Sequence, residues 1–192
     1  MIEFLKDLDI KLLIEINKHH TPFLDSVMWF ASGKLSWLPF YALLLILIIY
    51  KYKKQSWWII LLILPLITAS DQLAASVIRP LAMRLRPSHE PGLENLLHYV
   101  NNYRGGNYGF VSAHTLNVFS LATYLTLVVK DKIKWLPYIL FPWAAFVAYS
   151  RIYLGVHYPT DVLVPLVLGL ILGCLFAWVY NRFKNKIFKN TL

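Results

Sequence analysis

Residues 162–180 read VLVPLVLGLILGCLFAWVY, a stretch without a charged side chain. A helix needs about 20 apolar residues to cross the roughly 30 Å hydrocarbon layer of a bilayer. Within lipid, a backbone segment has to satisfy its own hydrogen bonds, and a helix does this without help from other segments. The stretch therefore predicts a membrane-spanning helix and, with it, an all-α membrane protein.

Four further stretches that are long, apolar and nearly free of charge precede it, at residues 35–50, 56–78, 110–129 and 135–149. The chain has 192 residues, of which 58% are hydrophobic and 15% charged, and its mean hydropathy is +0.52. In soluble proteins about a quarter of the residues are charged. A soluble fold of this length could not bury this much apolar surface. We therefore expect a polytopic transmembrane helical bundle of five spans, with six spans as the alternative.

The segment before the first span has a different pattern. Apolar residues recur at helical spacing between charged ones: Leu5, Leu8, Leu12 and Ile16. This pattern is typical of a helix that lies in the membrane interface. Residues 22–32 are apolar but too short to cross a bilayer straight. We expect one membrane domain over residues 1–192, with interfacial and dipping helices over 1–34 and a transmembrane core over 35–181.

Lysine and arginine residues predict the orientation of the chain. They gather between the first two spans, between the third and fourth, and in a basic tail at residues 182–192. With alternating spans these segments share one face, which the positive-inside rule assigns to the cytoplasm. The long loop at residues 79–109 then faces the periplasm or cell exterior. We expect a multi-pass protein of a bacterial-type inner (plasma) membrane.

Composition also argues against other classes of protein. The formal net charge of +9 and the pI of about 9.6 would suggest nucleic-acid binding in a soluble protein. Here the lysines lie beside apolar runs rather than on one amphipathic face, so we expect no nucleic-acid partner. Cys174 is the only cysteine, which excludes an intrachain disulfide and a thiolate metal cluster.

Polar residues that are unusual at membrane depth occur where spans end on the face that carries the long loop. They are Arg79, Arg84 and Arg86 after the second span, Ser112 and His114 at the third, Arg151 after the fourth, and His157 and Asp161 at the fifth. Ionisable groups at membrane depth are costly and mark a functional site by default. These residues belong to segments that are distant in sequence, and we predict that they come together in one site.

The types of side chain suit a phosphate group. Arginine presents a planar fork of donors that matches phosphate oxygens, and Ser112 begins a helix, whose free N–H groups favour an anion. His157 and Asp161 are four residues apart, so the carboxylate can accept from one ring nitrogen and leave the other free to attack. His114 would be the separate acid that protonates the leaving group.

These residues form three motifs that resemble, in order and spacing, those of the type 2 phosphatidic acid phosphatase (PAP2) family. The family motifs are K-x6-R-P, P-S-G-H and S-R-x5-H-x3-D. This chain has Arg79-x6-Arg86-Pro87, then Ser112-Ala113-His114, then Ser150-Arg151-x5-His157-x3-Asp161. Arg79 replaces the family's lysine, and Val111 and Ala113 replace its proline and glycine.

The resemblance implies a membrane-embedded hydrolase of lipid metabolism that needs no metal or other cofactor. It implies that His157 forms a phosphohistidine and that His114 acts first as the acid and then as the base for water. The phosphoryl group would be held by Arg79, Arg86, Ser112, Ala113 and Arg151. The substrate would be a phosphorylated lipid, such as undecaprenyl diphosphate, lipid A, phosphatidylglycerol phosphate or phosphatidic acid.

Other interpretations remain open at this point. A metal hydrolase could use His114, His157 and Asp161 as ligands, although three nearby arginines would repel a cation and no H-E-x-x-H pattern exists. A small transporter or anion-binding protein would also use intramembrane arginines, but no repeat of broken helices is evident.

We expect Asp71 to be the structural partner of an arginine or hydroxyl, and residues 103–107 to form a flexible loop. For His98, head-group contact and simple solvation are equally consistent with the sequence.

Overall fold

The computed structural model describes residues 2–188 and the side chains of residues 4–184, and its regular elements are helical. Over these residues the only β-type pairing is an isolated bridge between Leu85 and Tyr108. The all-α prediction is therefore confirmed. The main helices are α1 (Ile2–Lys18), α2 (Pro22–Ser32), α3 (Leu38–Tyr52), α4 (Ser56–Leu61), α5 (Ile63–Gln72), α6 (Arg79–Ala82), α7 (Ala113–Val129), α8 (Pro137–Tyr153) and α9 (Pro159–Phe188).

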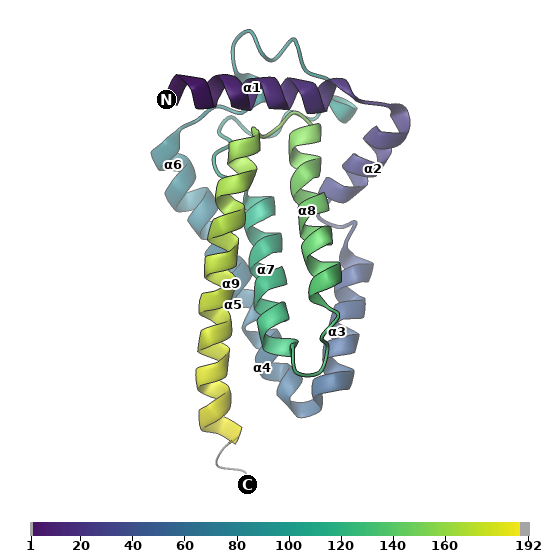
Figure 1. Ribbon diagram of the computed structural model, residues 1–192, viewed down its shortest axis with the longest axis vertical. Coiled ribbons are helices and arrows are strands. Elements are labelled where there is room, and N and C mark those ends of the chain that lie inside the picture. The colour runs from purple at the N-terminus through teal and green to yellow at the C-terminus, as the bar shows by residue number, and fades with distance from the viewer. Residues whose placement is uncertain (1, 189–192) are drawn as a thin grey trace.

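The long helices run along the length of the molecule, and α1 lies across one end of them (Figure 1). Helix α3 leads into the short 3-10 turn η1 (Lys53–Gln55), where the chain reverses, and α4, α5, the π-helical turn η2 (Leu73–Ile78) and α6 return toward the α1 end. Two segments, Leu38–Ala82 and Pro159–Lys184, are long and apolar enough to cross a membrane. The first of them contains this reversal.

The basic segments meet at the end of the molecule opposite α1. The α3–α4 and α7–α8 turns both lie there, and so does the C-terminal end of α9 (Figure 1). The Lys132 ammonium donates to the carbonyl of Lys51 at 3.0 Å, and Lys184 lies 4.0 Å from Asp131. These segments lie at one end of the molecule, as the prediction that they share one face requires. Residues 189–192 of the predicted basic tail lie outside the described residues.

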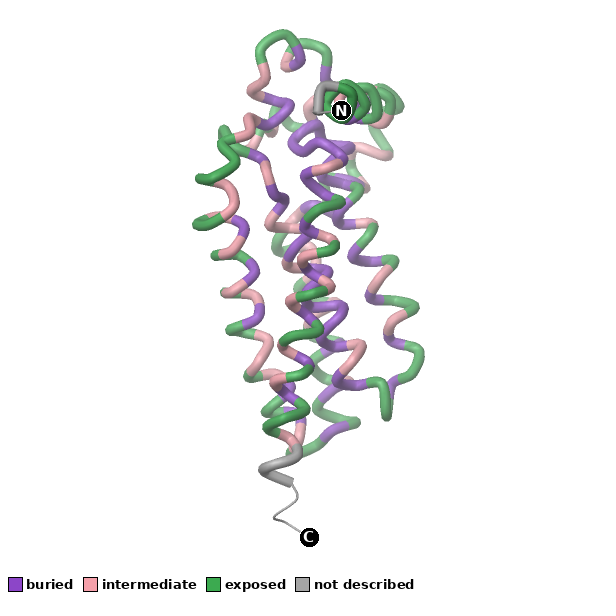
Figure 2. Tube along the Cα trace, turned by 60° about the vertical axis from the view of Figure 1, so that its left-hand side comes forward, coloured by how far each residue is buried: buried purple, intermediate pink, exposed green. Residues whose placement is uncertain are grey.

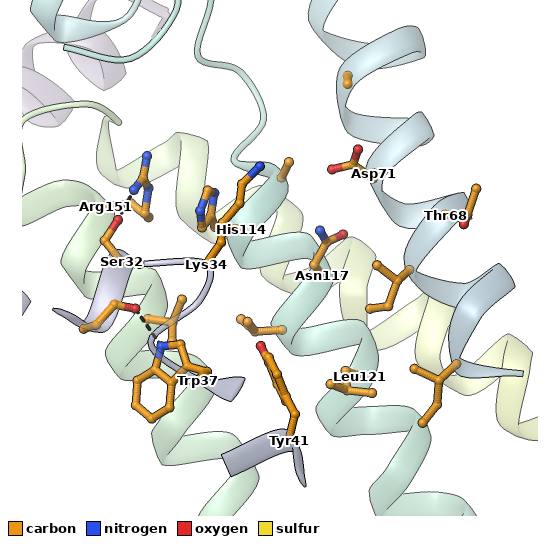
Figure 3. Close-up of a pocket in the computed structure, with 18 of the residues that line it drawn as sticks. Ser32, Lys34, Trp37, Tyr41, Thr68, Asp71, His114, Asn117, Leu121 and Arg151 are labelled. Carbon is orange, nitrogen blue, oxygen red and sulfur yellow. Dashed lines mark hydrogen bonds between the residues drawn. The ribbon is translucent and has the colours of Figure 1, made fainter. Parts of the chain in front are cut away.

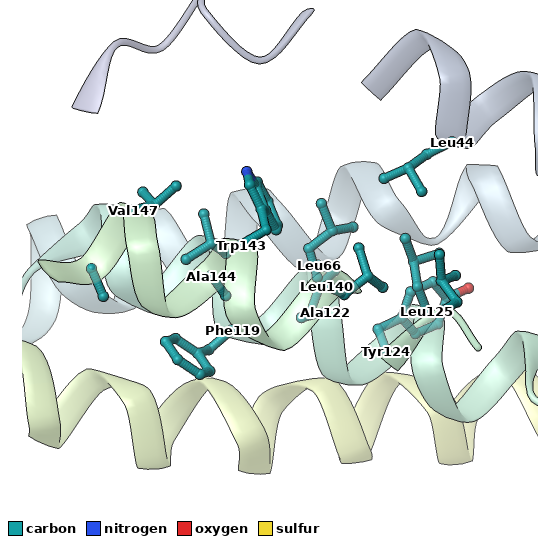
Figure 4. Packing of buried hydrophobic residues seen from close by; sticks show 14 of the residues in the cluster. Leu44, Leu66, Phe119, Ala122, Tyr124, Leu125, Leu140, Trp143, Ala144 and Val147 are labelled. Atoms are coloured by element: carbon teal, nitrogen blue, oxygen red, sulfur yellow. The ribbon is translucent and has the colours of Figure 1, made fainter. Parts of the chain in front are cut away.

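Helix α7 forms the centre of the bundle. It packs most extensively on α9 and also on α8 and α5. In Figure 2 the buried residues follow the middle of the molecule, and in Figure 4 Phe119, Leu125 and Trp143 belong to one apolar cluster. Large apolar side chains such as Leu64 and Ile171 are instead exposed on the outside. An apolar exterior of this kind is what a lipid-facing surface requires.

Two glycines of α9 allow its backbone to contact α7. A Cβ atom on Gly173 would lie 2.6 Å from Thr123 Cβ and 2.7 Å from the Ser120 carbonyl oxygen. A Cβ atom on Gly169 would lie 3.0 Å from backbone atoms of α7. Small residues at such crossings let membrane helices approach closely, and van der Waals packing then holds them. The α7–α9 contact brings together the starts of both helices, where the second and third motifs lie.

The N-terminal helices are fixed to the bundle by buried polar side chains. The Asn17 amide donates to the carbonyls of His98 and Tyr153 at 2.9 and 2.8 Å, and it accepts from the His98 N–H at 2.7 Å. Asp25 accepts from the Tyr153 hydroxyl at 2.7 Å and pairs with the His98 ring at 2.8 Å. His98 therefore connects the long loop to α2. This role differs from both that were considered from the sequence, head-group contact and simple solvation.

The close α7–α9 contact predicts that Gly173→Val destabilises the protein. The added side chain collides with backbone atoms of α7 that cannot rotate away, and overpacking of this kind costs about 1–3 kcal/mol. Thermal unfolding in one detergent measures the loss, which should appear as a lower midpoint. Gly106→Val is the matched control, because a Cβ atom there meets nothing within 4 Å. Equal midpoints for the two variants would contradict the packing argument.

Candidate active site

His157 lies in the short turn between α8 and α9 and is almost completely buried. The turn depends on Gly155, whose φ of +68° is in the left-handed region that favours glycine. The N–H of Val156 donates to the carbonyl of Arg151 at 3.4 Å. The turn thereby holds the two parts of the third motif, Arg151 and His157, in a fixed relation.

The His157 ring faces a different side chain at each nitrogen. Nδ1 makes no hydrogen bond but lies 3.5 Å from Asp161 Oδ2, one turn along the start of α9. Nε2 lies 3.1 Å from Arg86 Nη1. A guanidinium can only donate, so this network assigns a lone pair to Nε2 and the proton to Nδ1, on the side of Asp161. This is the tautomer that the four-residue spacing of His157 and Asp161 predicts for a nucleophilic imidazole.

Burial and neighbouring positive charge keep the imidazole neutral. Burial lowers the pKa of His157 well below its usual value, and the guanidinium groups of Arg86 and Arg151 lower it further. Burial also lowers the pKa of Arg86 to about 10, so this side chain is still charged at neutral pH. The site therefore combines a neutral nitrogen with a lone pair and a permanent positive charge beside it.

Three guanidinium groups surround His157, and each comes from a different segment. Arg86 donates to the carbonyls of Tyr108 and Val156 at 3.2 Å each. Arg79 donates to the Val111 carbonyl at 3.4 Å, and Arg151 donates to the hydroxyl of Ser32.

Among the side chains that the structure describes, no carboxylate forms an ion pair with Arg79, Arg86 or Arg151. The buried Nε atoms of Arg79 and Arg151 also lack a hydrogen-bond acceptor. Buried positive charges without counter-charge are costly, so this cluster is built to receive an anion.

The second motif begins α7, with Ser112 as its N-cap. The Ser112 hydroxyl accepts from the N–H of Thr115 at 3.4 Å and from its hydroxyl at 3.2 Å, and the Ser112 N–H donates to the Asp161 carbonyl at 2.9 Å. The serine therefore orders the helix start and joins it to α9. N–H groups in the first turn of a helix have no partner within the helix, so those of Ala113 and His114 are the ones suited to an anion.

A cavity of about 950 Å³ opens onto this cluster. It is lined by Arg79, Arg86, Ala113, His114, Arg151 and His157, and it continues between α3, α5 and α7. Figure 3 shows the ring of His114 and the guanidinium of Arg151 at one end of it. The predicted phosphate-binding and catalytic residues thus share one cavity, except that Ser112 and Asp161 lie fully buried behind it.

The glycine-containing segment of the long loop packs directly on Arg86. A Cβ atom on Gly105, whose φ is +70°, would lie 2.9 Å from Arg86 Nη1, and one on Gly109 would lie 2.9 Å from Arg86 Cγ. Tyr103 accepts from Arg151 at 3.4 Å. The sequence predicted a flexible loop at residues 103–107. The structure shows a loop at these residues and places Tyr103 and Gly105 against two arginines of the site, with Gly105 making room for Arg86.

Sequence reasoning missed a second layer of charge behind His157. Arg84 donates to Asp161 Oδ1 at 3.0 Å and to Asp9 Oδ2 at 2.7 Å. Asp9 comes from α1, is almost fully buried, and also accepts from the N–H of Thr160 at 2.9 Å. The sequence contains a pattern that could have identified Asp9 as buried. Asp9, Leu13 and Asn17 recur every four residues and form the buried face of α1.

The structure also bears on the metal-hydrolase alternative and on the expectation for Asp71. His157 Nδ1 lies 3.5 Å from Asp161, but His114, His157 and Asp161 do not place three ligand atoms within 4.8 Å of one another, and within the described residues only His20, Asp25 and His98 do so. The structure therefore gives no support to the metal-hydrolase alternative. Asp71 was expected to have a structural partner. Among the described side chains it has neither an ion pair nor a hydrogen bond, and it lines the cavity.

Comparison with known proteins agrees with this arrangement. The model of the PAP2 superfamily matches residues 60–187. The lipid A 4'-phosphatase of Bacteroides thetaiotaomicron is 37% identical over 193 residues, which covers 100% of this chain and 85% of that protein. The lipid A 4'-phosphatase of Porphyromonas gingivalis is 33% identical over 180 residues, which covers 93% of this chain and 75% of that protein.

The fold is also that of a solved structure. The crystal structure of a PAP2-type phosphatidylglycerolphosphate phosphatase from Bacillus subtilis matches with a TM-score of 0.70 and 21% sequence identity, covering 95% of this chain and 87% of that one. At this identity the comparison shows the fold alone. The arrangement of helices around the cavity is thus shared with a known membrane phosphatase.

The contact between Asp9 and Arg84 predicts that Asp9→Asn lowers kcat for phosphate release about tenfold, or ~1.4 kcal/mol. Arg84 without its second carboxylate holds Asp161 less firmly, whereas the residues that line the cavity are unchanged, so KM should stay within about twofold. Asp7→Asn is the control, because Asp7 is an exposed residue of the same helix.

The double variant Asp9→Asn/Arg84→Gln should be little worse than Arg84→Gln alone, because both changes act on one network. Losses in kcat that simply add would show that Asp9 does not act through Arg84.

Proposed function

The chain belongs to the PAP2 superfamily and is a membrane-embedded lipid phosphatase, and we propose that its substrate is a phosphate ester of lipid A. The observation that carries the proposal is the cluster of Arg79, Arg86 and Arg151, whose charges have no described carboxylate partner and surround a neutral, buried His157. Two lipid A 4'-phosphatases that align with nearly the whole chain support the choice of lipid.

The reaction begins with attack by Nε2 of His157 on phosphorus. A P–N bond forms while the P–O bond to the lipid breaks, and His114 gives its proton to the leaving oxygen. The equatorial phosphoryl oxygens accept from Arg79, Arg86 and Arg151, which offset the charge of the transition state. Asp161 stabilises the positive charge that develops on the His157 ring, because its carboxylate lies 3.5 Å from Nδ1.

Water then completes the cycle. His114 takes a proton from a water molecule, whose oxygen attacks phosphorus as the P–N bond breaks. Inorganic phosphate leaves, and His157 returns to its neutral state. Because the three guanidinium groups supply the positive charge that a metal ion supplies in other phosphatases, we propose a reaction without metal or other cofactor.

We propose that five helical segments cross the membrane as a single domain: α3, α4 with α5 and α6, α7, α8, and α9. Helix α1 would lie in the interface next to the active site, with Leu5, Leu8 and Leu12 exposed to lipid. Lysines cluster at the opposite end of the molecule, so that end would be cytoplasmic. The active site would then open to the periplasmic side of an inner membrane.

The assignment of the nucleophile predicts that His157→Gln loses at least about 1,000-fold in the rate of phosphate release from purified lipid A in detergent. Glutamine cannot form a phosphorylated nitrogen, although it fills a similar volume. A radiolabelled phosphate should be trapped on the wild-type protein in an acid-labile, base-stable form and should be absent from the variant. His19→Gln, at an exposed position just after α1, should keep normal activity and labelling. Labelling that persisted in His157→Gln would refute the assignment.

The proposed orientation predicts which residues an impermeant thiol reagent can reach. In a Cys174→Ser background, a cysteine at Asn95 should react on spheroplasts with an intact inner membrane, since this exposed residue lies in the long loop. A cysteine at Lys54, which is exposed in the α3–α4 turn, should react only after the inner membrane is broken. The reverse labelling pattern would place the active site on the cytoplasmic side.

A further inference from the structure

The cavity has polar residues that none of the three motifs includes. Lys34, Asp71 and Asn117 line it at the level of His114, and they come from the α2–α3 connection, α5 and α7. We call these three residues the head-group ring. Figure 3 shows them on different sides of the cavity, with Asp71 across from His114. A group bound at the phosphate cluster would carry its next atoms into the space that they enclose.

Lys34 is held at the cavity by the chain on both sides of it. Ser32 accepts from Arg151, and the indole N–H of Trp37 donates to the Ala31 carbonyl at 2.9 Å. In Figure 3 the Lys34 side chain extends toward His114. This ammonium is thus a further cation next to the phosphate site, placed to donate to an oxygen of the same substrate.

Asp71 and Asn117 supply the complementary groups. Asp71 lies on α5, is exposed and lines the cavity, and it has no ion pair or hydrogen bond among the described side chains. An ionisable residue of a proposed spanning helix that serves no internal pair indicates a ligand. The Asn117 amide oxygen accepts from the Ser70 hydroxyl, which turns the amide nitrogen toward the cavity. The ring therefore offers one acceptor and two donors around one part of the cavity, and of the three side chains Asn117 is held by a hydrogen bond.

Below the head-group ring the cavity becomes apolar. Leu44 and Ile48 of α3, Ile67 of α5, and Leu121 of α7 line this part. Helix α3 contacts α8 through Phe40 and Trp143, whose ring centroids are 5.1 Å apart, and it leaves its other side to the cavity. Hydrocarbon chains fit such a space. A volume of about 950 Å³ accommodates one sugar ring and the first segments of the chains attached to it.

We infer that the head-group ring binds the sugar that carries the phosphate and that it selects phosphorylated glycolipids over other lipid phosphates. Asp71 accepts from a hydroxyl or amide N–H of the sugar, while Asn117 and Lys34 donate to its oxygens. A polyprenyl diphosphate presents neither hydroxyl nor amide donors beside its phosphates, so Asp71 would lose water without gaining a partner. The inference rests on the proposed function, and it adds the residues that would recognise the substrate.

The test compares three substrates with one set of variants. Purified wild type, Asp71→Ala and Asn117→Ala are assayed in the same detergent with phosphorylated lipid A, undecaprenyl diphosphate and the small ester p-nitrophenyl phosphate. Each variant should lose at least about tenfold in kcat/KM with lipid A, since a hydrogen bond to the sugar is lost. With p-nitrophenyl phosphate both should stay within about twofold of wild type, whereas with undecaprenyl diphosphate neither should lose activity and Asp71→Ala should gain, because the carboxylate that found no partner on this lipid is gone. Asp131→Ala removes an exposed carboxylate outside the cavity and should change nothing.

The outcomes separate the two proposals. Equal losses with all three substrates, or no loss with lipid A, would overturn the role of the head-group ring while leaving lipid A as the substrate. If wild type instead hydrolyses undecaprenyl diphosphate far better than lipid A, the proposed substrate is wrong and the sugar-binding role falls with it. Activity of the variants on p-nitrophenyl phosphate shows in each case that the protein is folded and that its phosphate cluster is intact.

Discussion

A buried carboxylate is stable only if donors or positive charge satisfy it, and the site depends on how this is done for Asp161. Its oxygens accept from Arg84 at 3.0 Å and from the N–H of Tyr158 at 3.1 Å, while its second oxygen also faces His157. Arg84 is in turn held by Asp9 at 2.7 Å. Two carboxylates thus share one guanidinium, and removing Arg84 would leave both of them buried without a counter-charge, which costs about 3–5 kcal/mol.

This balance explains why the other arginines are available to a substrate. If Asp161 paired with Arg86 instead, the guanidinium beside Nε2 of His157 would be neutralised and drawn away from the cavity. Because Arg84 occupies Asp161, Arg86 keeps its charge and takes only carbonyl oxygens and Nε2 as acceptors. Those neutral acceptors can be exchanged for phosphate oxygens at small cost. The structure therefore separates the arginine that pairs with Asp161 from Arg79, Arg86 and Arg151, which we propose bind the phosphate.

The sequence predicts best what is local. The helix positions follow from apolar stretches, and the relation between His157 and Asp161 follows from one turn of α9. Contacts between distant segments could not be predicted in this way. Asp9 is one of several acidic residues in an amphipathic helix, and only its docking against Arg84, 75 residues later, makes it part of the site. Lys34 and Gly105 gain their roles from the packing of the α2–α3 connection and of the long loop, which no short pattern encodes.

Helix α1 has an exposed apolar side and a buried polar side, and each has a separate function. Leu5, Leu8 and Leu12 are exposed on one side of it, whereas Asp9 and Asn17 are buried on the other. If the exposed side lies in lipid, the depth of α1 in the interface is set by burial of apolar surface. The same rigid helix carries Asp9 to Arg84 and Thr160, at the start of α9. With α1 in the interface as proposed, one element would set the position of His157 relative to the membrane surface and would place the proposed nucleophile at the level of the lipid head groups.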